Sequence, residues 1–214
     1  MQSITLKNVR PRVFEDEDLS LSQVWDTDLV FTRGQTYVVE APSGTGKSSL
    51  CAYIYGNRRD YTGHIRFDDR DISTITPGEW QKLRRTELAY LPQELDLFPE
   101  LTAMQNLCLK NDLTGHLPHS RLREWMEALG LADRMDFPVG KMSIGQQQRV
   151  AIIRSICQPF SFLLIDEPVS HLDARNNALA AEIIMTEARR QNAAVIATSV
   201  GNRIGIPTDT ELHL

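Results

Sequence analysis

The stretch from Ala41 to Ser49 reads A-P-S-G-T-G-K-S-S, and it decides the fold expected for the whole chain. A β-branched and aromatic run, Tyr37-Val38-Val39, precedes it, and an apolar pattern of helical spacing that closes at Gly56 follows it. A strand, a glycine-containing loop and a helix in this order let backbone N–H groups converge on a polyphosphate. The stretch therefore predicts a phosphate-binding loop.

Each residue type in this loop has a physical reason to contact phosphate or metal. Gly44 and Gly46 free the backbone to approach phosphate oxygens. Lys47 would reach the β- and γ-phosphates, and the hydroxyl of Ser48 would be a ligand for Mg²⁺. The nucleotide-binding residues expected here are Ser43, Gly44, Thr45, Gly46, Lys47, Ser48 and Ser49. Ala41 replaces the first glycine of the G-x-x-x-x-G-K-[ST] pattern, which leaves an ordinary strand–turn–helix with a solvated lysine as the alternative.

The 214-residue chain has the length and composition of a soluble globular protein of one domain, with or without an attached lobe. Its net charge is −5 and its basic pairs lie far apart, so we expect no nucleic acid among its partners. No apolar run approaches the ~20 residues that span a bilayer, and no secretion signal is present. Because Cys51, Cys108 and Cys157 lack metal-type spacing, we expect reduced core thiols in a cytosolic protein, neither secreted nor integral to a membrane.

Two strand-like runs in the second half of the chain indicate an α/β fold. Residues 162–165 and 194–198 are continuous apolar runs flanked by amphipathic helices, as expected of parallel strands buried on both faces. Further strands are expected at Ser3 to Val9, Thr36 to Glu40, His64 to Phe67 and Glu87 to Leu91, with a turn at Asp68-Asp69. The expected class is α/β, a P-loop NTPase core with a mostly parallel sheet, an antiparallel N-terminal β part and an inserted α-helical subdomain.

Helix signals replace strand signals between residues 94 and 157. The helix signals in this range are capping boxes at Thr102 and Ser143 and an apolar stripe at Leu122, Trp125, Met126 and Leu129; a further capping box at Thr76 starts a helix before it. We therefore divide the single domain, residues 1–214, into an α/β nucleotide-binding core (1–93 and 158–214) and a helical subdomain (94–157).

Two carboxylates, Asp166 and Glu167, end the apolar run 162–165. Ligands of open α/β sheets gather at the carboxyl ends of strands, so this tip should face the phosphate loop. Asp166 would then hold Mg²⁺ together with Ser48, and Glu167 would orient or deprotonate an attacking water. Gln93, at the end of another apolar strand, is expected to contact Mg²⁺ or that water. The alternative is a polar strand end without chemistry.

The stretch from Ser143 to Ala151, S-I-G-Q-Q-Q-R-V-A, opens a helix with a serine and a glycine, which suits an anion site. Such a site would be redundant with the first loop unless it served a second nucleotide. With these residues the chain resembles the nucleotide-binding domains of ATP-binding-cassette (ABC) proteins. The matching motifs, in order, are Walker A at Ala41 to Ser48, the Q-loop at Gln93, the signature at Ser143 to Gln147, Walker B at Leu163 to Glu167 and the D-loop at Ser170-His171-Leu172-Asp173.

The resemblance implies an ABC ATPase subunit that dimerises with an identical or different ABC subunit around ATP and Mg²⁺. Each ATP would be held by Lys47 of one subunit and by signature residues of the other. The implied trans contacts are Ser143, Ile144, Gly145 and Gln146, with Asp173 in the D-loop, and Phe14 would stack on adenine. A separate integral membrane permease is implied as partner, its short helix entering a groove near residues 93–98. The subunit would then lie in the cytoplasm, peripheral on the cytoplasmic face of the membrane.

Three positions depart from the family pattern. Ala41 would cost about 1 kcal/mol if that position needs a positive φ. Ile144 replaces the first glycine of the signature, while Ser143 and Gly145 keep the anion site. Ser199 stands where the family has a histidine that contacts the γ-phosphate, and a serine is shorter and cannot become cationic.

We therefore expect ATP binding and dimerisation with slow hydrolysis, and Ser199 joins Glu167 and Gln93 as an expected catalytic position. The alternative function is a nucleotide-gated switch or scaffold with weak hydrolysis. A cassette that acts on DNA or ribosomes is disfavoured by the acidic balance of the chain. Phosphoryl transfer to a metabolite would leave the residues from Ser143 to Arg149 unexplained.

Overall fold

The computed structural model describes residues 1–167, 172–201 and 203–214. The strands are β1 Ser3–Pro11, β2 Asp28–Thr32, β3 Thr36–Glu40, β4 Tyr61–Phe67, β5 Arg70–Asp71, β6 Leu88–Leu91, β7 Phe162–Asp166, β8 Ala194–Ser199 and β9 Thr210–His213. The α-helices are α1 Lys47–Ile54, α2 Pro77–Thr86, α3 Ala103–Asn111, α4 His119–Ala128, α5 Ile144–Ile156 and α6 Ala174–Arg190. Short 3₁₀ turns lie at Arg12–Phe14, Ile72–Thr74, Ala132–Arg134 and Val139–Lys141.

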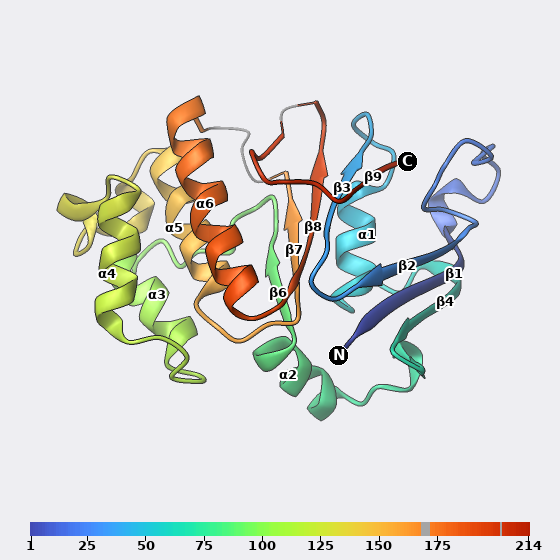
Figure 1. Cartoon of the computed structure of the whole chain (residues 1–214), viewed down its shortest axis with the longest axis horizontal. Coiled ribbons are helices and arrows are strands. Elements are labelled where there is room, and N and C mark those ends of the chain that lie inside the picture. The colour runs from blue at the N-terminus through green and yellow to red at the C-terminus, as the bar shows by residue number, and fades with distance from the viewer. Residues whose placement is uncertain (168–171, 202) are drawn as a thin grey trace.

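Two β-sheets organise these elements (Figure 1). A four-stranded sheet of order β2-β1-β4-β5 has antiparallel neighbours, and a five-stranded sheet of order β6-β7-β8-β3-β9 has parallel neighbours. Both the parallel core and the antiparallel N-terminal part that the sequence predicts are confirmed. Because all five strands of the larger sheet run the same way, their carboxyl ends meet at one edge.

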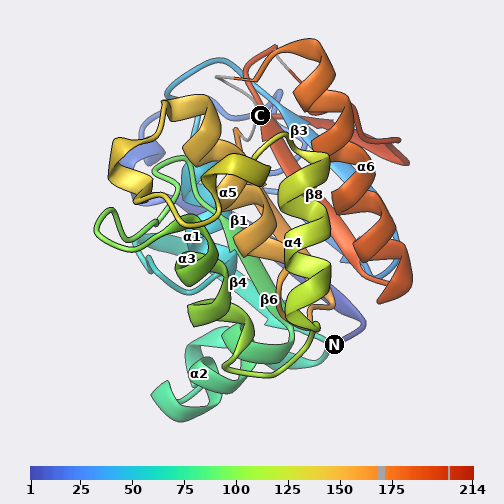
Figure 2. The same ribbon diagram turned by 90° about the vertical axis from the view of Figure 1, so that its left-hand side faces the viewer.

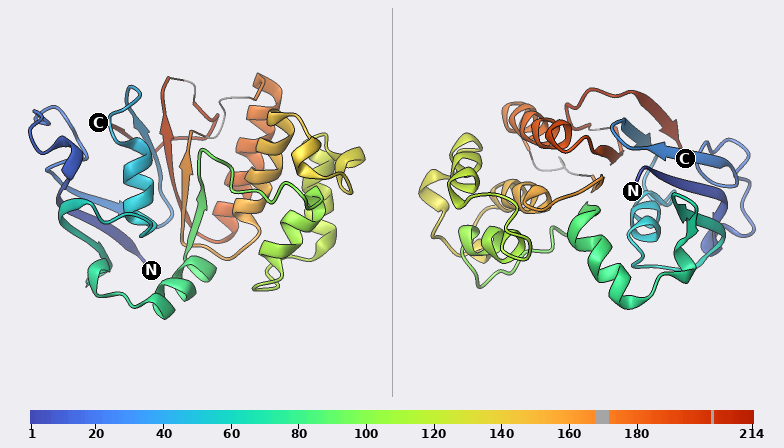
Figure 3. Two further views of the ribbon diagram at one scale, coloured as in Figure 1. Left: turned by 180° about the vertical axis from the view of Figure 1, so that it is seen from behind. Right: turned by 60° about the horizontal axis from the view of Figure 1, so that its bottom comes forward.

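Side chains of the parallel strands alternate between two hydrophobic cores. In β7, Leu163 and Ile165 pack into the core that contains α5 and α6, whereas Phe162 and Leu164 pack into the core that contains α1. The antiparallel sheet closes the second core from its far side, so α1 lies between the two sheets (Figures 1 and 3). This position fixes the N-terminus of α1 relative to the ends of β3 and β7.

The helices outside the sheets begin where the sequence predicts. Thr76, Thr102 and Ser143 are the N-caps of α2, α3 and α5, and each forms a complete capping box with the residue three positions on. Figure 2 shows α3, α4 and α5 packed together beside the parallel sheet. One continuous core joins these helices to the sheet, and the subdomain boundaries at residues 94 and 157 stay a prediction. No helix among the described residues is long and apolar enough to span a bilayer.

Three strands, β2, β5 and β9, are not predicted from the sequence. All three are at an edge of their sheet; β5 has two residues and buries neither, while β2 and β9 each bury a single side chain, Phe31 and Leu212. A strand with one buried residue carries almost no alternating apolar pattern, so its pairing is decided by the neighbouring strand. β1 and β4 are also longer than predicted, since they pair with each other along most of their lengths.

The three cysteines are free, but they do not share one environment. Cys51 and Cys157 are buried, as expected, whereas Cys108 on α3 is partly exposed. The expectation of a core thiol is therefore wrong for Cys108, because its position on α3 lies at the rim of the larger core, where the side chain packs against the core but stays partly exposed.

Candidate functional site

The loop between β3 and α1 is shaped by two glycines in the left-handed region. Gly44 has a φ of 86°, and Gly46, the N-cap of α1, has a φ of 98°. A Cβ added to Gly44 would meet no atom within 4 Å, whereas one on Gly46 would approach Phe14 Cε2 at 2.9 Å and Trp25 Cζ2 at 3.1 Å. The loop is therefore open at Gly44 and packed against aromatic rings at Gly46.

Lys47 lies under this loop. Its side chain is 3% exposed, and its Nζ donates hydrogen bonds to the carbonyl oxygens of Ala41 (3.0 Å) and Pro42 (2.6 Å). The same Nζ is 3.6 Å from Oε1 of Glu167, a carboxylate that is 22% exposed. A buried ammonium is costly without such partners, so loop and carboxylate together hold this charge in place.

Ala41 fits its place in the loop without backbone strain. Its N–H donates to the carbonyl of Ser199 at 3.2 Å, and it is not among the non-glycine residues with positive φ. The condition for the cost of about 1 kcal/mol is therefore not met, since that cost applies to left-handed backbone alone.

One threonine, Thr198, holds the carboxylate of Asp166 and the backbone of Glu167 at the end of β7. Asp166 is 2% exposed, and its Oδ1 accepts a hydrogen bond from Thr198 Oγ1 at 2.7 Å. The N–H of Glu167 donates to the same hydroxyl oxygen at 3.2 Å. Glu167 has a φ of 49°, a left-handed conformation that costs a non-glycine residue roughly 1 kcal/mol. The strand end is thus held in a fixed, strained geometry.

Asp166 is electrostatically coupled to α1. Burial, and then the charge of Asp166, raise the pKa of the Cys51 thiol in that helix. Ser48, in the first turn of α1, is exposed, and α1 begins just after the carboxyl end of β3, so its hydroxyl group belongs to the same edge of the sheet. Carboxylate and hydroxyl oxygens are donors that suit Mg²⁺, so this donor set fits a hard divalent cation.

Gln93 and Ser199 follow two further parallel strands. Gln93 is exposed, two residues beyond β6, and Leu91 of β6 lies opposite Ile165 of β7. Ser199 ends β8 opposite Glu40 of β3 and is 3% exposed. Both residues therefore lie at the carboxyl edge of the sheet with Asp166.

The signature residues lie apart from this edge. Ser143 and Ile144 begin α5, which packs against α3, α4 and α6, whereas α1 packs against β7 and β8 on the other side of the sheet (Figure 1). Ser143 is exposed and Ile144 is 49% exposed. One copy of the chain does not bring its signature to its own phosphate loop.

Three other predicted residues have partners within the protein. Phe14 is 8% exposed and packs near Gly46, and the hydroxyl of Ser49 accepts a hydrogen bond from Arg58 at 2.8 Å. Asp173 is the N-cap of α6, where its carboxylate accepts the N–H of Asn176 at 2.8 Å. The predicted D-loop residues Ser170 and His171 lie outside the described residues. The nucleotide contacts assigned to these positions stay predictions.

Sequence reasoning missed two residues that build the site, Thr198 and Trp25. Thr198 is opposite Asp166 in the register of β7 and β8, and a polar β-branched residue ending an apolar strand was the available signal. Trp25 donates its indole N–H to the carbonyl of Thr45 at 3.2 Å and so anchors the loop from a distant segment. No local pattern in the sequence predicts this contact between distant segments.

The sequence of the chain is similar to those of known proteins. Residues 24–170 match the sequence profile of the ABC transporter family. An uncharacterised ABC transporter ATP-binding protein of Mycobacterium tuberculosis is 33% identical over 174 residues, covering 80% of this chain and 53% of that protein. The macrolide export ATP-binding/permease protein MacB of Marinobacter nauticus is 28% identical over 190 residues, covering 87% of this chain and 30% of MacB.

A solved structure has the same fold. It is the ATP-binding cassette MJ0796, a dimer in a post-hydrolysis state bound to ADP and Pi, with a TM-score of 0.74 and 22% identity over 93% of this chain and 88% of that chain. The chain spans about half the length of the mycobacterial relative, 53% of it. The match to the family profile, together with the ordered motifs around the loop, shows that the chain belongs to the ABC transporter family.

Proposed function

We propose that the chain is the ATP-binding and ATP-hydrolysing subunit of an ABC transporter, working as a dimer with a separate membrane permease. The observation that carries the proposal is the buried Nζ of Lys47, held between the loop carbonyls and Glu167 at 3.6 Å. It supports a site where a bound triphosphate takes the place of Glu167 as the ion-pair partner of Lys47. The relatives and the family profile support the same function.

The residues at the sheet edge have distinct roles in hydrolysis. The backbone N–H groups of the loop and the Lys47 ammonium bind phosphate oxygens, while Ser48 and Asp166 hold Mg²⁺, with Gln93 nearby. The metal, when bound, neutralises charge on the phosphates. When Lys47 turns to phosphate, Glu167 loses its ion-pair partner and becomes free to accept a proton from water. Thr198 keeps Asp166 and the backbone of Glu167 in place throughout.

A second subunit completes the site in this proposal. Ser143 and Ile144 are exposed at the N-terminus of α5, where backbone N–H groups suit an anion. Because the signature is remote from the loop of its own chain, it is available to the nucleotide of a partner. The related cassette MJ0796 is a dimer in its solved structure. Nucleotide would then favour the closed dimer by mass action.

The function is tested by measuring nucleotide affinity, hydrolysis and oligomeric state on the same preparation. We expect Mg²⁺-dependent ATP binding, release of phosphate, and a shift from monomer to dimer when ATP replaces ADP. A chain that binds no nucleotide in calorimetry, with or without its membrane partner, would rule the proposal out.

The permease contact is proposed at a pocket between α3, α5 and the loop after β6. Its lining includes Tyr55, Tyr90, Phe98, Lys110 and Arg154, and its volume is about 400 Å³. Burial and the charge of Arg154 lower the pKa of Lys110, and neither cation has a salt bridge among the described residues. Asp96 also lines the pocket, so two cations face one acid there, and the excess positive charge favours an acidic side chain on the permease segment. Such contact would hold the subunit in the cytoplasm at the membrane face.

Charge reversal at this pocket should weaken the permease complex. We expect Lys110→Glu to reduce affinity for the permease about tenfold, which is about 1.4 kcal/mol, because a carboxylate would repel the acidic segment. Affinity is measured with the permease in detergent, against Lys7→Glu on β1 as the control, an equal charge change on an exposed residue of the antiparallel sheet. Equal binding by both variants would remove this pocket from the interface.

A nucleotide-gated switch with weak hydrolysis is the second candidate, favoured by one observation. Ser199 is 3% exposed at the carboxyl edge of the sheet, and its side chain cannot supply a cation to a phosphate. ATP affinity and dimerisation would then be normal while turnover stays slow. Comparison of the dissociation constant with kcat separates the two candidates.

Ser199→His should speed hydrolysis if this position limits it. An imidazolium at the end of β8 would add a charge-assisted hydrogen bond to the transferred phosphate, so we expect kcat to rise about 10-fold or more. Ser199→Gln is the matched control, since it adds length and polarity without charge. Steady-state phosphate release at saturating ATP is the measurement, and an unchanged kcat in Ser199→His would assign the slow step elsewhere.

A further inference from the structure

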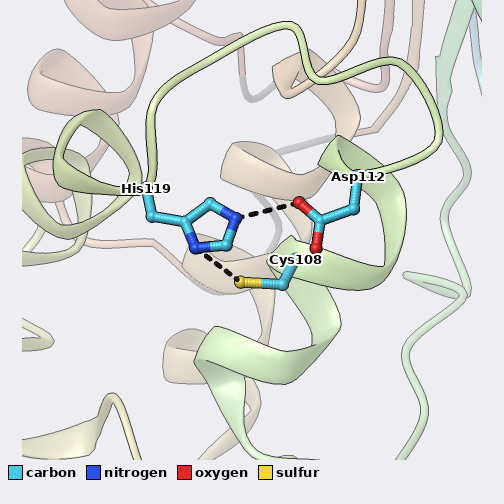
Figure 4. Close-up of side chains that lie close together, drawn as sticks. All are labelled: Cys108, Asp112 and His119. Carbon is cyan, nitrogen blue, oxygen red and sulfur yellow. Dashed lines mark hydrogen bonds and ion pairs between the residues drawn. The ribbon is translucent and has the colours of Figure 1, made fainter.

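Three side chains with metal-binding chemistry meet on the surface where α3 ends and α4 begins (Figure 4). Cys108 lies in the last turn of α3, Asp112 is its C-cap, and His119 is the first residue of α4. One ligand atom from each residue lies within 4.8 Å of the other two. This cluster has no part in the nucleotide site described above.

The hydrogen bonds of the cluster orient the imidazole of His119. Its Nε2 is 2.9 Å from Oδ1 of Asp112, and its Nδ1 is 3.9 Å from Sγ of Cys108. With the carboxylate accepting from Nε2–H, Nδ1 keeps its lone pair, and this nitrogen lies 3.9 Å from the sulfur. A carboxylate behind a histidine in this way fixes the tautomer that a metal ion requires.

We propose that this cluster binds a soft divalent cation of the Zn²⁺ type between Cys108 Sγ and His119 Nδ1, with Asp112 orienting the imidazole. Tetrahedral Zn²⁺ with bonds of about 2.3 Å to sulfur and about 2.0 Å to nitrogen separates the two donors by about 3.5 Å. The present separation of 3.9 Å needs a change of a few tenths of an ångström. Water molecules complete the coordination.

The same three residue types also describe an activated thiol nucleophile, but the electrostatics oppose that function. Burial, and then the charge of Asp112, raise the pKa of the Cys108 thiol. An activated nucleophile needs the reverse, a thiolate stabilised at neutral pH.

A second cluster provides an internal comparison. Glu40, Glu211 and His213 also bring three ligand atoms within 4.8 Å of one another. There the guanidinium of Arg203 already donates hydrogen bonds to both carboxylates. In the Cys108 cluster, the ion pair found for Asp112 among the described residues is with His119. The Glu40 cluster therefore already holds a cation, the guanidinium of Arg203, whereas the Cys108 cluster has room for a metal ion.

Bound metal would join two helices of the helical region. Cys108 and Asp112 belong to the end of α3, and His119 to the start of α4, with residues 113–118 between them. A cation that binds only the folded arrangement stabilises it by mass action. The midpoint of thermal unfolding should therefore rise with Zn²⁺ concentration.

The experiment uses the full chain, treated with chelator and titrated with Co²⁺ and then Zn²⁺. We expect a thiolate-to-cobalt charge-transfer band at one equivalent of Co²⁺, displaced by Zn²⁺. Cys108→Ser should abolish the band, and His119→Gln should weaken Zn²⁺ binding at least about tenfold while keeping the thiol. Asp112→Asn should weaken it about 10-fold, because it loses the orienting carboxylate charge.

His213→Gln is the matched control, since it removes a histidine from the cluster that Arg203 already neutralises. It should keep the cobalt band, the Zn²⁺ affinity and the thermal shift of the parent chain. Zn²⁺ binding that survives unchanged in both Cys108→Ser and His119→Gln, or that is lost in His213→Gln, would overturn the proposal. Cys51 and Cys157 are buried and should give no band in the folded protein.

Discussion

Glu167→Gln is expected to reduce kcat for ATP hydrolysis at least about 100-fold while leaving ATP affinity within a factor of a few. The carboxamide keeps the size and hydrogen bonding of the side chain but cannot take a proton from water, and a general base contributes about 10² to 10⁴ in rate. It also ends the charge interaction with Lys47 Nζ, now 3.6 Å away, so the ammonium turns to phosphate more readily. ATP-bound dimers should accumulate because their decay by hydrolysis is blocked.

Phosphate release measured at saturating ATP and sedimentation velocity with ATP and Mg²⁺ give the two readouts. Glu94→Gln is the matched control, the same chemical change on an exposed residue beside Gln93. Hydrolysis by Glu167→Gln at the parental rate would exclude Glu167 as the base. A variant that is slow yet entirely monomeric with ATP would instead contradict the shared-nucleotide dimer.

The parts of the fold that local chemistry dictates could be predicted from the sequence. The capping boxes at Thr76, Thr102 and Ser143 start helices in the structure as they do in the pattern, because each satisfies two backbone donors by itself. The apolar run ending in Asp166 is a strand buried on both faces. These elements needed no distant partner for their prediction.

Other features depend on contacts between distant segments, and the sequence does not reveal them. β2 and β9 exist because a neighbouring strand offers a free edge, and each buries one side chain. Trp25 holds the carbonyl of Thr45, twenty positions further along the chain, through an indole N–H hydrogen bond of 3.2 Å. The role of Trp25 depends on how distant segments pack together, and no local sequence pattern predicts it.

The candidate site shows the same division. The sequence places Lys47 and Glu167 at the ends of elements, and the structure brings their charges to 3.6 Å. It does not reveal that Thr198 holds both acidic residues, because that hydroxyl acts across strands. Nor does spacing alone show that Ala41 avoids a positive φ, since the conformation follows from its bond to Ser199.

Lys47→Met should lower ATP affinity at least about 100-fold, or about 2.7 kcal/mol, while the protein stays folded. Methionine keeps the length of the stem but removes the charge-assisted hydrogen bonds to phosphate, which are the strongest that the loop can offer. In the parent chain the ammonium also bonds the carbonyls of Ala41 and Pro42, so those acceptors lose a donor. The variant also avoids the cost of burying a charge, which offsets the lost hydrogen bonds. The free energy of unfolding should therefore change by less than the free energy of ATP binding does.

Calorimetric titration with ATP and Mg²⁺ measures the affinity, and denaturant unfolding without nucleotide measures the stability. The matched control is Lys110→Met, the same substitution at a half-buried lysine of the pocket between α3, α5 and the loop after β6. This control variant should bind ATP as the parent chain does. If Lys47→Met kept the parental affinity for ATP, the ammonium of Lys47 would only stabilise the loop through its contacts with Ala41, Pro42 and Glu167. The phosphates would then bind elsewhere. Lys47 already pairs with Glu167 before nucleotide binds. The change in ATP affinity therefore measures the contribution of Lys47 to phosphate binding, separately from its contribution to the stability of the fold.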